Sequence, residues 1–436
     1  MRLFNRRYET ISRDDIDQIQ LERLQSTLNK AYKNIAFYQG EMKHRDISPR
    51  DVSSVKDLSK IGFTTRDDLS YNYPYGLFAV PLRDIVRINS TSGITGKPTV
   101  IGYTKNDLGV WTELISRLYT GAGVTADDIV QMSFDFGMAN WGRSMRTAAE
   151  HIEASVIPMS YLNPAKELMI MSDYRTSCLV TTPSHALHLS WLAKEKGIQV
   201  ENLNISRAIL VSEPLTDADR SRVESGLGVH VSTAYGIPEG MGPGIAYECG
   251  EGRLHISEDH FIVEAVHPET GNPVAPGDDG ELVVTTITTK AFPLIRFRTG
   301  DISRIIPDAG CPCGRTFSVM DVPMERSDDM LTFRGVKVYP DQIKSVLADV
   351  LGEAPPFVIE MYKVKELDHM DIHVEEGEAL FSDTIKRLEN IITRIQGDLL
   401  ELLGIRANIK LVERSTMQEL LEGGKQVIYR DTLSKE

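Results

Sequence analysis

The chain has 436 residues and a formal net charge of −14, with 41% hydrophobic and 25% charged residues. This length exceeds one ordinary single-core domain, and the acidic charge argues against nucleic-acid binding, which needs basic surface to replace counterions. No window approaches the ~18 uninterrupted apolar residues of a membrane span, and the first residues lack the apolar core of a secretory signal. We therefore expect a cytoplasmic protein without a membrane or nucleic-acid partner.

Three patterns follow one another along the first 306 residues. Apolar residues recur at three- and four-residue steps over residues 15–38, which predicts one amphipathic helix packed on a core. From about residue 85 to 260, short apolar runs such as SCLVTT and AILVSE alternate with helical stretches such as SHALHLSWLAKEKG. That alternation predicts α/β layers with largely parallel strands, and residues 261–306 then change to strands joined by turns.

The pattern shifts again near residues 326–335, after which strands and helices alternate within a unit of about 105 residues, a usual domain size. We therefore predict an α/β fold with two domains. Residues 1–326 form a large N-terminal domain of layered sheets and helices with a β-rich subdomain, and residues 327–436 form a small α+β C-terminal domain.

A loop of hydroxyls, glycines and one lysine lies between the apolar stretches DIVRI and VIGYT. Backbone N–H groups, hydroxyls and a lysine in this order can surround a polyphosphate, although an unliganded polar hairpin would have the same composition. The Walker pattern is not met, since only two residues separate the glycines and Pro98 replaces the Ser or Thr that would hold magnesium. The candidate phosphate-binding residues are Ser90, Thr91, Ser92, Gly93, Thr95, Gly96 and Lys97.

This loop resembles the phosphate loop of the adenylate-forming enzymes, and further motifs of that family follow in the same order. Ala234-Tyr235-Gly236-Ile237-Pro238-Glu239 resembles the family's aromatic-glycine motif, which implies that Tyr235 stacks on adenine and Glu239 holds Mg²⁺. Val211-Ser212-Glu213-Pro214 resembles the segment beside adenine, and Phe297-Arg298-Thr299-Gly300-Asp301 the segment whose aspartate binds the ribose hydroxyls. The resemblance thus assigns nucleotide contacts to Ser212, Glu213, Pro214, Tyr235, Gly236 and Asp301.

Two segments near the predicted boundary, residues 325–330 and 335–340, resemble the family's hinge and the segment after it. The resemblance implies that the small domain is mobile about Asp328, that Arg326 contacts the nucleotide, and that coenzyme A passes the backbone of Gly335. Near the C-terminus, Gly423-Gly424-Lys425 takes the place of the family's mobile catalytic lysine. The implied catalytic residues are therefore Lys425, Glu239 and Arg326, although a lysine in such a tail is otherwise a solvated residue.

Longer matches point to the phenylacetate-coenzyme A ligase branch of this superfamily. They are GFTTRDDL at residues 62–69, NYPYGLFA at 72–79 and MGPG at 241–244, within a likeness that runs from about Leu21 to Arg430. The resemblance implies an ATP-dependent acid:coenzyme A ligase that uses Mg²⁺, forms an acyl-adenylate and then its thioester, and is a homodimer. One departure is Pro238, which stands where relatives have a hydroxyl residue before the magnesium-binding glutamate.

Three of the four cysteines, Cys249, Cys311 and Cys313, come with His255 as a possible closed metal site. Three thiolates and one imidazole suit a tetrahedral structural zinc ion, although reduced thiols beside an unrelated histidine would give the same sequence. The fourth cysteine, Cys178, is expected to be a buried core thiol.

Four aromatic or apolar residues are candidates for the pocket that binds the acid substrate. Phe136 takes the place of an aromatic residue beside the acyl group in relatives, and Trp141, Ile237 and Pro238 are further candidates for an aromatic-lined slot, although the same residues could be ordinary core. A flat aryl or arylacetic acid is the expected substrate. Two alternatives stay open: AMP transfer to a deazaflavin cofactor, and a nucleotide-binding protein without catalysis.

Overall fold

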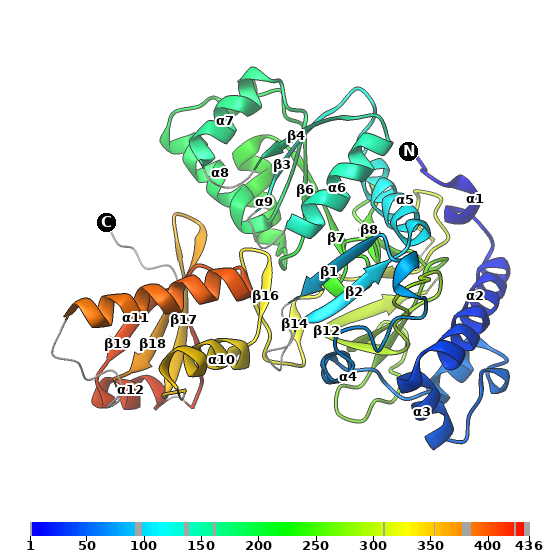
Figure 1. Ribbon diagram of the computed structural model, residues 1–436. Coiled ribbons are helices and arrows are strands. Elements are labelled where there is room, and N and C mark those ends of the chain that lie inside the picture. Colours follow the sequence, from blue (N-terminus) through cyan, green and yellow to red (C-terminus); the bar gives the residue numbers. More distant parts are fainter. Residues whose placement is uncertain are drawn as a thin grey trace.

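The structure is a computed structural model that describes residues 2–91, 98–134, 139–159, 163–307, 310–352, 354–376, 385–422 and 424–430. A large N-terminal part and a small C-terminal part lie side by side, joined near β14 (Glu325–Arg326), as Figure 1 shows. Within the described residues, no helix has the length and hydropathy of a membrane span. The domain boundary at residues 326–327 stays a prediction.

The N-terminal helices differ from the single helix expected over residues 15–38. α2 (Arg13–Asn34) and α3 (Ala36–His44) are separate, because Ile35 between them has extended backbone with φ −120° and ψ 110°. Tyr38 and Met42 after the break are buried in the same hydrophobic core as Leu28 of α2. The bend thus keeps α3 on the core, where a straight helix would carry its apolar face past it.

One large sheet crosses the N-terminal part, with strand order β10-β11-β12-β13-β9-β8-β7-β6-β5-β3-β4 in the described residues. Its parallel half confirms the predicted α/β layers and comprises β3 (Ile129–Ser133), β4 (Ser155–Met159), β5 (Cys178–Thr181), β6 (Arg207–Leu210) and β7 (His230–Tyr235). Its antiparallel half comprises β8 (Ala246–Glu248), β9 (Leu254–Ile256), β10 (Phe261–Val266), β11 (Asp279–Thr286), β12 (Phe297–Ile306) and β13 (Val319–Met320). The pairing changes from parallel to antiparallel at β7, where the candidate site begins.

Helices cover both faces of the parallel half, which explains why its strands are continuous apolar runs. The flanking helices are α5 (Lys105–Gly121), α6 (Ala139–His151), α7 (Pro164–Asp173), α8 (Pro183–Glu195) and α9 (Asp217–Leu227). Val180 faces the core that contains Met145 of α6, whereas its neighbour Leu179 faces the core that contains Leu187 of α8 and Val223 of α9. Alternate residues of one strand therefore supply two separate cores.

The C-terminal part has its own sheet, with strand order β19-β18-β17-β20, and its own hydrophobic core. Its elements are β15 (Leu331–Phe333), β16 (Val336–Val338), α10 (Pro340–Leu351), β17 (Phe357–Val364), β18 (Leu367–Glu375), α11 (Ile385–Asp398), β19 (Asn408–Val412), α12 (Arg414–Leu421) and β20 (Val427–Tyr429). The predicted strands around PFVIEMYKV and MDIHVEE are thus confirmed. α11 continues into a π-helical turn at Leu399–Leu403 that ends at left-handed Gly404.

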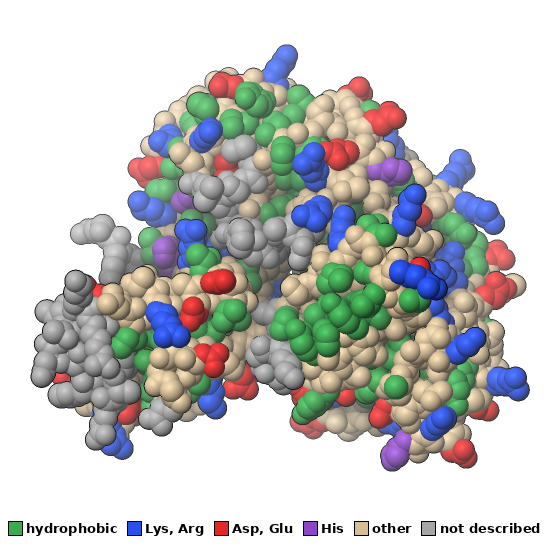
Figure 2. All heavy atoms as spheres, in the orientation of Figure 1, with side chains coloured by type: hydrophobic (Ala, Val, Ile, Leu, Met, Phe, Trp, Pro, Cys, Tyr) green, Lys and Arg blue, Asp and Glu red, His purple; other side chains and the backbone are tan. Residues whose placement is uncertain are grey.

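Exposed hydrophobic side chains gather on one face of the large part, over α4 (Arg66–Tyr71), β1 (Arg87–Thr91) and β2 (Thr99–Tyr103), as Figure 2 shows. Exposed hydrophobic residues of this region are Tyr71, Tyr73, Tyr75, Leu82, Val86 and Ile88. The homodimer and the cytoplasmic location expected from the sequence stay predictions.

Candidate active site

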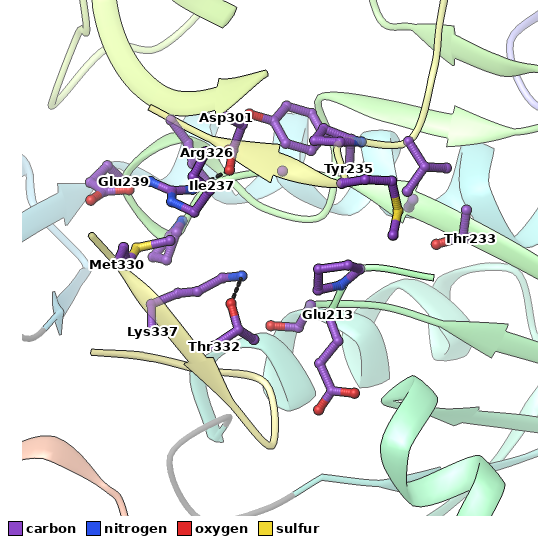
Figure 3. Close-up of a pocket in the computed structure, with 18 of the residues that line it drawn as sticks. Glu213, Thr233, Tyr235, Ile237, Glu239, Asp301, Arg326, Met330, Thr332 and Lys337 are labelled. Atoms are coloured by element: carbon purple, nitrogen blue, oxygen red, sulfur yellow. Dashed lines mark hydrogen bonds and ion pairs between the residues drawn. The ribbon is translucent and has the colours of Figure 1, made fainter. Parts of the chain in front are cut away.

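A pocket open to solvent lies where β7 ends and the C-terminal part meets the large sheet. Figure 3 shows side chains from both parts pointing into it. The site residues expected from the sequence that line it are Thr91, Trp141, Ser212, Glu213, Pro214, Tyr235, Gly236, Ile237, Pro238, Glu239, Asp301 and Arg326. Segments separated by more than 200 residues therefore meet in one cavity.

The turn after β7 is held against the backbone of residues 242–243. A Cβ atom at Gly236 would lie 2.6 Å from the Cα of Gly242 and 2.8 Å from the Cα of Pro243, so only glycine fits this close approach. Tyr235 immediately before it is buried, and its hydroxyl donates a hydrogen bond of 2.7 Å to Asp301 Oδ2. This packing fixes where the Tyr235 ring stands in the pocket.

Asp301, Arg326 and Asp328 form one charged cluster at the junction between the two parts. Arg326 donates to both carboxylate oxygens of Asp328, at 2.6 and 2.8 Å, and forms an ion pair with Asp301. Burial alone would raise the pKa of Asp328, but the bonds from Arg326 outweigh burial and hold it below its ordinary value. Gly300 has φ 78°, and a side chain there would collide with this cluster, since its Cβ would lie 2.5 Å from Arg326 and Asp328.

Glu239 is buried, and its two carboxylate oxygens have different surroundings. Oε1 lies 3.4 Å from Nε of Arg66, whereas Oε2 is buried without a hydrogen-bond partner among the described residues. A buried carboxylate oxygen without a partner is costly unless a ligand satisfies it. The residues present therefore fit Mg²⁺, a hard cation that prefers oxygen ligands.

Glu213 and Ser212 lie on the side of the pocket nearest the C-terminal part. Glu213 accepts hydrogen bonds of 2.8 Å from both the backbone N–H and the hydroxyl of Ser184, and burial raises its pKa to about 7. Ser212, at φ 75°, donates from its hydroxyl to the carbonyl oxygen of Gly335 at 2.7 Å. The β15–β16 hairpin is thus tied to the segment expected beside adenine.

Several pocket residues were not assigned from the sequence. Arg66 and Lys337 are the two cations among them, and Met330, Thr332 and Tyr339 also line the cavity. Lys337 donates from Nζ to the hydroxyl of Thr332 at 2.8 Å, and burial lowers its pKa to about 8. Arg66 belongs to the GFTTRDDL motif, which had marked the branch but carried no chemical assignment.

Other predicted residues stand elsewhere. Lys425 is exposed next to β20 and does not line the pocket, and Ser90 is an exposed residue of β1. Gly335 reaches the site through its carbonyl oxygen. Five loop residues and one acid-pocket residue lie outside the described residues: Ser92, Gly93, Thr95, Gly96, Lys97 and Phe136.

The apolar end of the pocket is formed around Trp141. A Cβ atom at Gly242 would lie 2.7 Å from the Trp141 ring, so the ring packs directly on that backbone. Ile237 and Pro238 complete this end, and each is carried by the turn after β7. A flat apolar group would find van der Waals partners here, with the Glu239 carboxylate a single residue further along the chain.

A second cluster, none of whose residues lines the pocket, brings together Cys249, His255, Cys311 and Cys313. One ligand atom of each lies within 4.8 Å of all the others. The sulfur atoms of Cys249 and Cys311 are 3.7 Å apart, which is too long for a disulfide and close to the ~3.8 Å between sulfur atoms around zinc at Zn–S ≈ 2.3 Å. The predicted four residues are therefore placed together by β8, β9 and the loop after β12.

The histidine of this cluster is oriented by the backbone. The Nδ1 atom of His255 lies 3.2 Å from the carbonyl oxygen of Phe317, to which it can donate, and Nε2 lies 3.3 Å from the Cys313 sulfur. An imidazole whose Nδ1–H is bonded in this way presents Nε2 to a metal. Burial lowers the pKa of His255 to about 4, so its neutral form, the one that can be a ligand, prevails near neutral pH.

Comparisons with known proteins agree with this architecture. Residues 335–430 match the family described as AMP-binding enzyme C-terminal domain. The chain is 38% identical over 377 residues to a phenylacetate-coenzyme A ligase of Thermus thermophilus, covering 86% of this chain and 84% of that protein. It is 36% identical over 413 residues to the Pseudomonas putida enzyme of the same name, covering 94% and 93%.

Solved structures of the same fold are more distant in sequence. A 2-hydroxyisobutyryl-CoA ligase in complex with 2-HIB-AMP and CoA, in its thioesterification state, superposes with a TM-score of 0.87 at 24% identity, covering 98% of this chain and 92% of that one. The same ligase in its postadenylation state gives a TM-score of 0.70. The fold therefore confirms the layered large domain with a small C-terminal domain.

Proposed function

The chain belongs to the phenylacetate-coenzyme A ligase family, and we propose that it joins a small aryl or arylacetic acid to coenzyme A. The reaction is that of an ATP-dependent, AMP-forming acid:CoA ligase, with an acyl-adenylate as its intermediate. The observation that supports the acid class is the Trp141 end of the pocket beside Glu239. Membership of this ligase family disfavours the two alternatives, AMP transfer to a deazaflavin and a nucleotide-binding protein without catalysis.

The nucleotide would occupy the charged end of the pocket. Asp301 offers a carboxylate to the vicinal ribose hydroxyls, displacing its bond from Tyr235, whose ring then faces adenine. Glu239 would hold Mg²⁺ through its unpartnered oxygen, and the metal would neutralise phosphate charge. Arg326 keeps Asp301 and Asp328 oriented while it supports the negative charge of the nucleotide.

The arrangement of the two domains supports assignment to the thioester-forming step. The TM-score is 0.87 against the thioesterification state of the 2-hydroxyisobutyryl-CoA ligase, compared with 0.70 against its postadenylation state. Lys425 is exposed, whereas Lys337 of the same domain points into the pocket. We therefore assign Lys425 to adenylation in a second arrangement, which the small domain reaches by rotating about Asp328.

Zinc would join two distant segments of the large domain in this proposal. The loop that carries Cys313 continues into Arg315, whose guanidinium forms a buried ion pair of 2.7 Å with Glu9 of α1 (Arg6–Glu9). A metal held by four protein ligands has no open position, so its role is structural. Loss of zinc would loosen the anchor of the N-terminal segment as well as the metal loop itself.

The acid class is tested by pyrophosphate release from Mg-ATP over a panel of aryl, arylacetic and short aliphatic acids. We expect phenylacetate or a similar flat acid to give a kcat/KM at least about tenfold above acetate, since each extra buried methylene contributes about 0.8 kcal/mol. Mass spectrometry of the products identifies the thioester. A preference for the short aliphatic acids would overturn the assignment of the Trp141 end to an aromatic group.

A further inference from the structure

The tip of the β17–β18 hairpin contacts the large domain away from the pocket. Figure 1 shows this hairpin reaching toward α8 and α9. Glu366 forms an ion pair with Arg222 of α9, with 2.6 Å between Oε1 and Nη2. The carbonyl oxygen of Lys365 accepts from Nδ1 of His188 at 2.8 Å, and the Lys365 ammonium lies 5.1 Å from the ring centre of Trp191.

The backbone of this tip is in a conformation that long side chains rarely adopt. Lys365 and Glu366 are the only residues between the two strands, and their φ values are 51° and 70°. Two positive φ angles in a two-residue hairpin define the turn in which Asn-Gly is the relaxed choice. The sequence instead has two long charged side chains here, and both contact the large domain.

The residues of the large domain that contact the tip are also held by contacts within that domain. The rings of His188 and Trp191, one helical turn apart on α8, stack at 5.7 Å with an interplanar angle of 17°. Arg222 is also bonded to Asp219 at 3.3 Å, which directs its guanidinium along the surface of α9. Burial lowers the pKa of His188, so the ring is neutral and donates through Nδ1–H.

The tip and the pocket are linked through the C-terminal domain. Arg334, in the turn between β15 and β16, donates to the carbonyl oxygen of Asp368 at 2.9 Å, and the next residue, Gly335, accepts from Ser212. Lys337 then enters the pocket from β16. The contact of the hairpin tip with the large domain and the contact of the β15–β16 hairpin with the pocket therefore form together, in the same arrangement of the two domains.

We propose that Lys365 and Glu366, with His188, Trp191 and Arg222, form a latch that holds the C-terminal domain in the thioester-forming arrangement. These are positioning residues, since they touch neither the pocket nor the reacting atoms. The proposal rests on the proposed function, in which Lys425 reaches the pocket only after the domain has rotated. The latch must therefore open for adenylation and close for thioester formation, so its strength sets the ratio of the two rates.

The test is a charge swap across the latch in the full-length enzyme. Glu366→Arg and Arg222→Glu each place like charges together, and the double variant restores an opposite pair. Two rates are measured for each variant: thioester formation from supplied phenylacetyl-adenylate, and pyrophosphate exchange. In each single variant we expect the ratio of the first rate to the second to fall about tenfold. In the double variant the ratio should return to within about threefold of wild type. The ratio does not depend on how much of a variant is folded.

A matched control is Asp279→Arg, which reverses one charge of the exposed Asp279–Arg304 pair within the large domain. It should leave the ratio unchanged. An unchanged ratio in the Glu366 and Arg222 variants, or a double variant no better than the single ones, would overturn the latch. Wild-type enzyme that makes no thioester from phenylacetyl-adenylate would instead contradict the proposed function or its acid class.

Discussion

Replacing Lys425 by alanine is expected to slow acyl-adenylate formation about 100- to 1,000-fold, the usual effect of removing a group that stabilises developing charge. Thioester formation from supplied phenylacetyl-adenylate should stay within about twofold of wild type. The reason is that Lys425 is exposed in the present arrangement, where Lys337 is the lysine in the pocket. Pyrophosphate exchange measures the first half-reaction, and CoA-dependent release of AMP from the adenylate measures the second.

The matched control is Lys344→Ala, which removes an exposed lysine from α10 of the same domain. Neither half-reaction should change. If the Lys425 variant lost the same factor in the rates of both half-reactions, Lys425 would not act in adenylation alone, and the proposal of two domain arrangements would be contradicted. An unaffected rate of adenylation would remove Lys425 from the catalytic residues.

Replacing Cys311 by serine is expected to abolish stoichiometric zinc and to lower the melting temperature by about 10 °C. Three sulfur ligands and one imidazole nitrogen surround one point, and binding energy of a structural zinc is folding energy. None of the four cluster residues lines the pocket, so kcat per folded molecule should change less than about threefold. Metal analysis of protein purified without added zinc, a thermal melt and an active-site titration give the three readouts.

Cys178→Ala is the control for loss of a thiol, because Cys178 is a fully buried residue of β5 outside the cluster. It should retain about one zinc per chain. Wild-type protein with no zinc would show that the four residues do not hold this metal. If the Cys311 variant kept the wild-type melting temperature but lost activity, the cluster would have a catalytic role and not a structural one.

The sequence predicted those elements whose pattern is set locally. The apolar run around Cys178 became β5, with helices on both faces, because buried parallel strands leave no polar alternation. The helix over residues 15–38 was wrong in extent. Its apolar spacing continues past Ile35, and nothing local shows that the chain must bend there to keep Tyr38 on the core.

Pocket residues that belong to recognised motifs could be predicted from the sequence. Pocket residues that only tertiary packing brings to the site could not. Tyr235, Glu239 and Asp301 line one pocket, and the roles that their motifs imply stay predictions. Arg66 and Lys337 had no assignment, because a lone cation in a helix start or a short strand is ordinarily solvated. Only the fold brings Arg66 within 3.4 Å of Glu239 and turns Lys337 inward.

Single turnover of the wild-type enzyme with Mg-ATP and phenylacetate shows whether two half-reactions occur in one site. Without coenzyme A, we expect pyrophosphate and enzyme-bound phenylacetyl-adenylate at about one per active site. Adding coenzyme A should convert the adenylate into thioester and AMP. Pyrophosphate release that requires coenzyme A from the start, or an adenylate that coenzyme A does not consume, would rule out this two-step reaction.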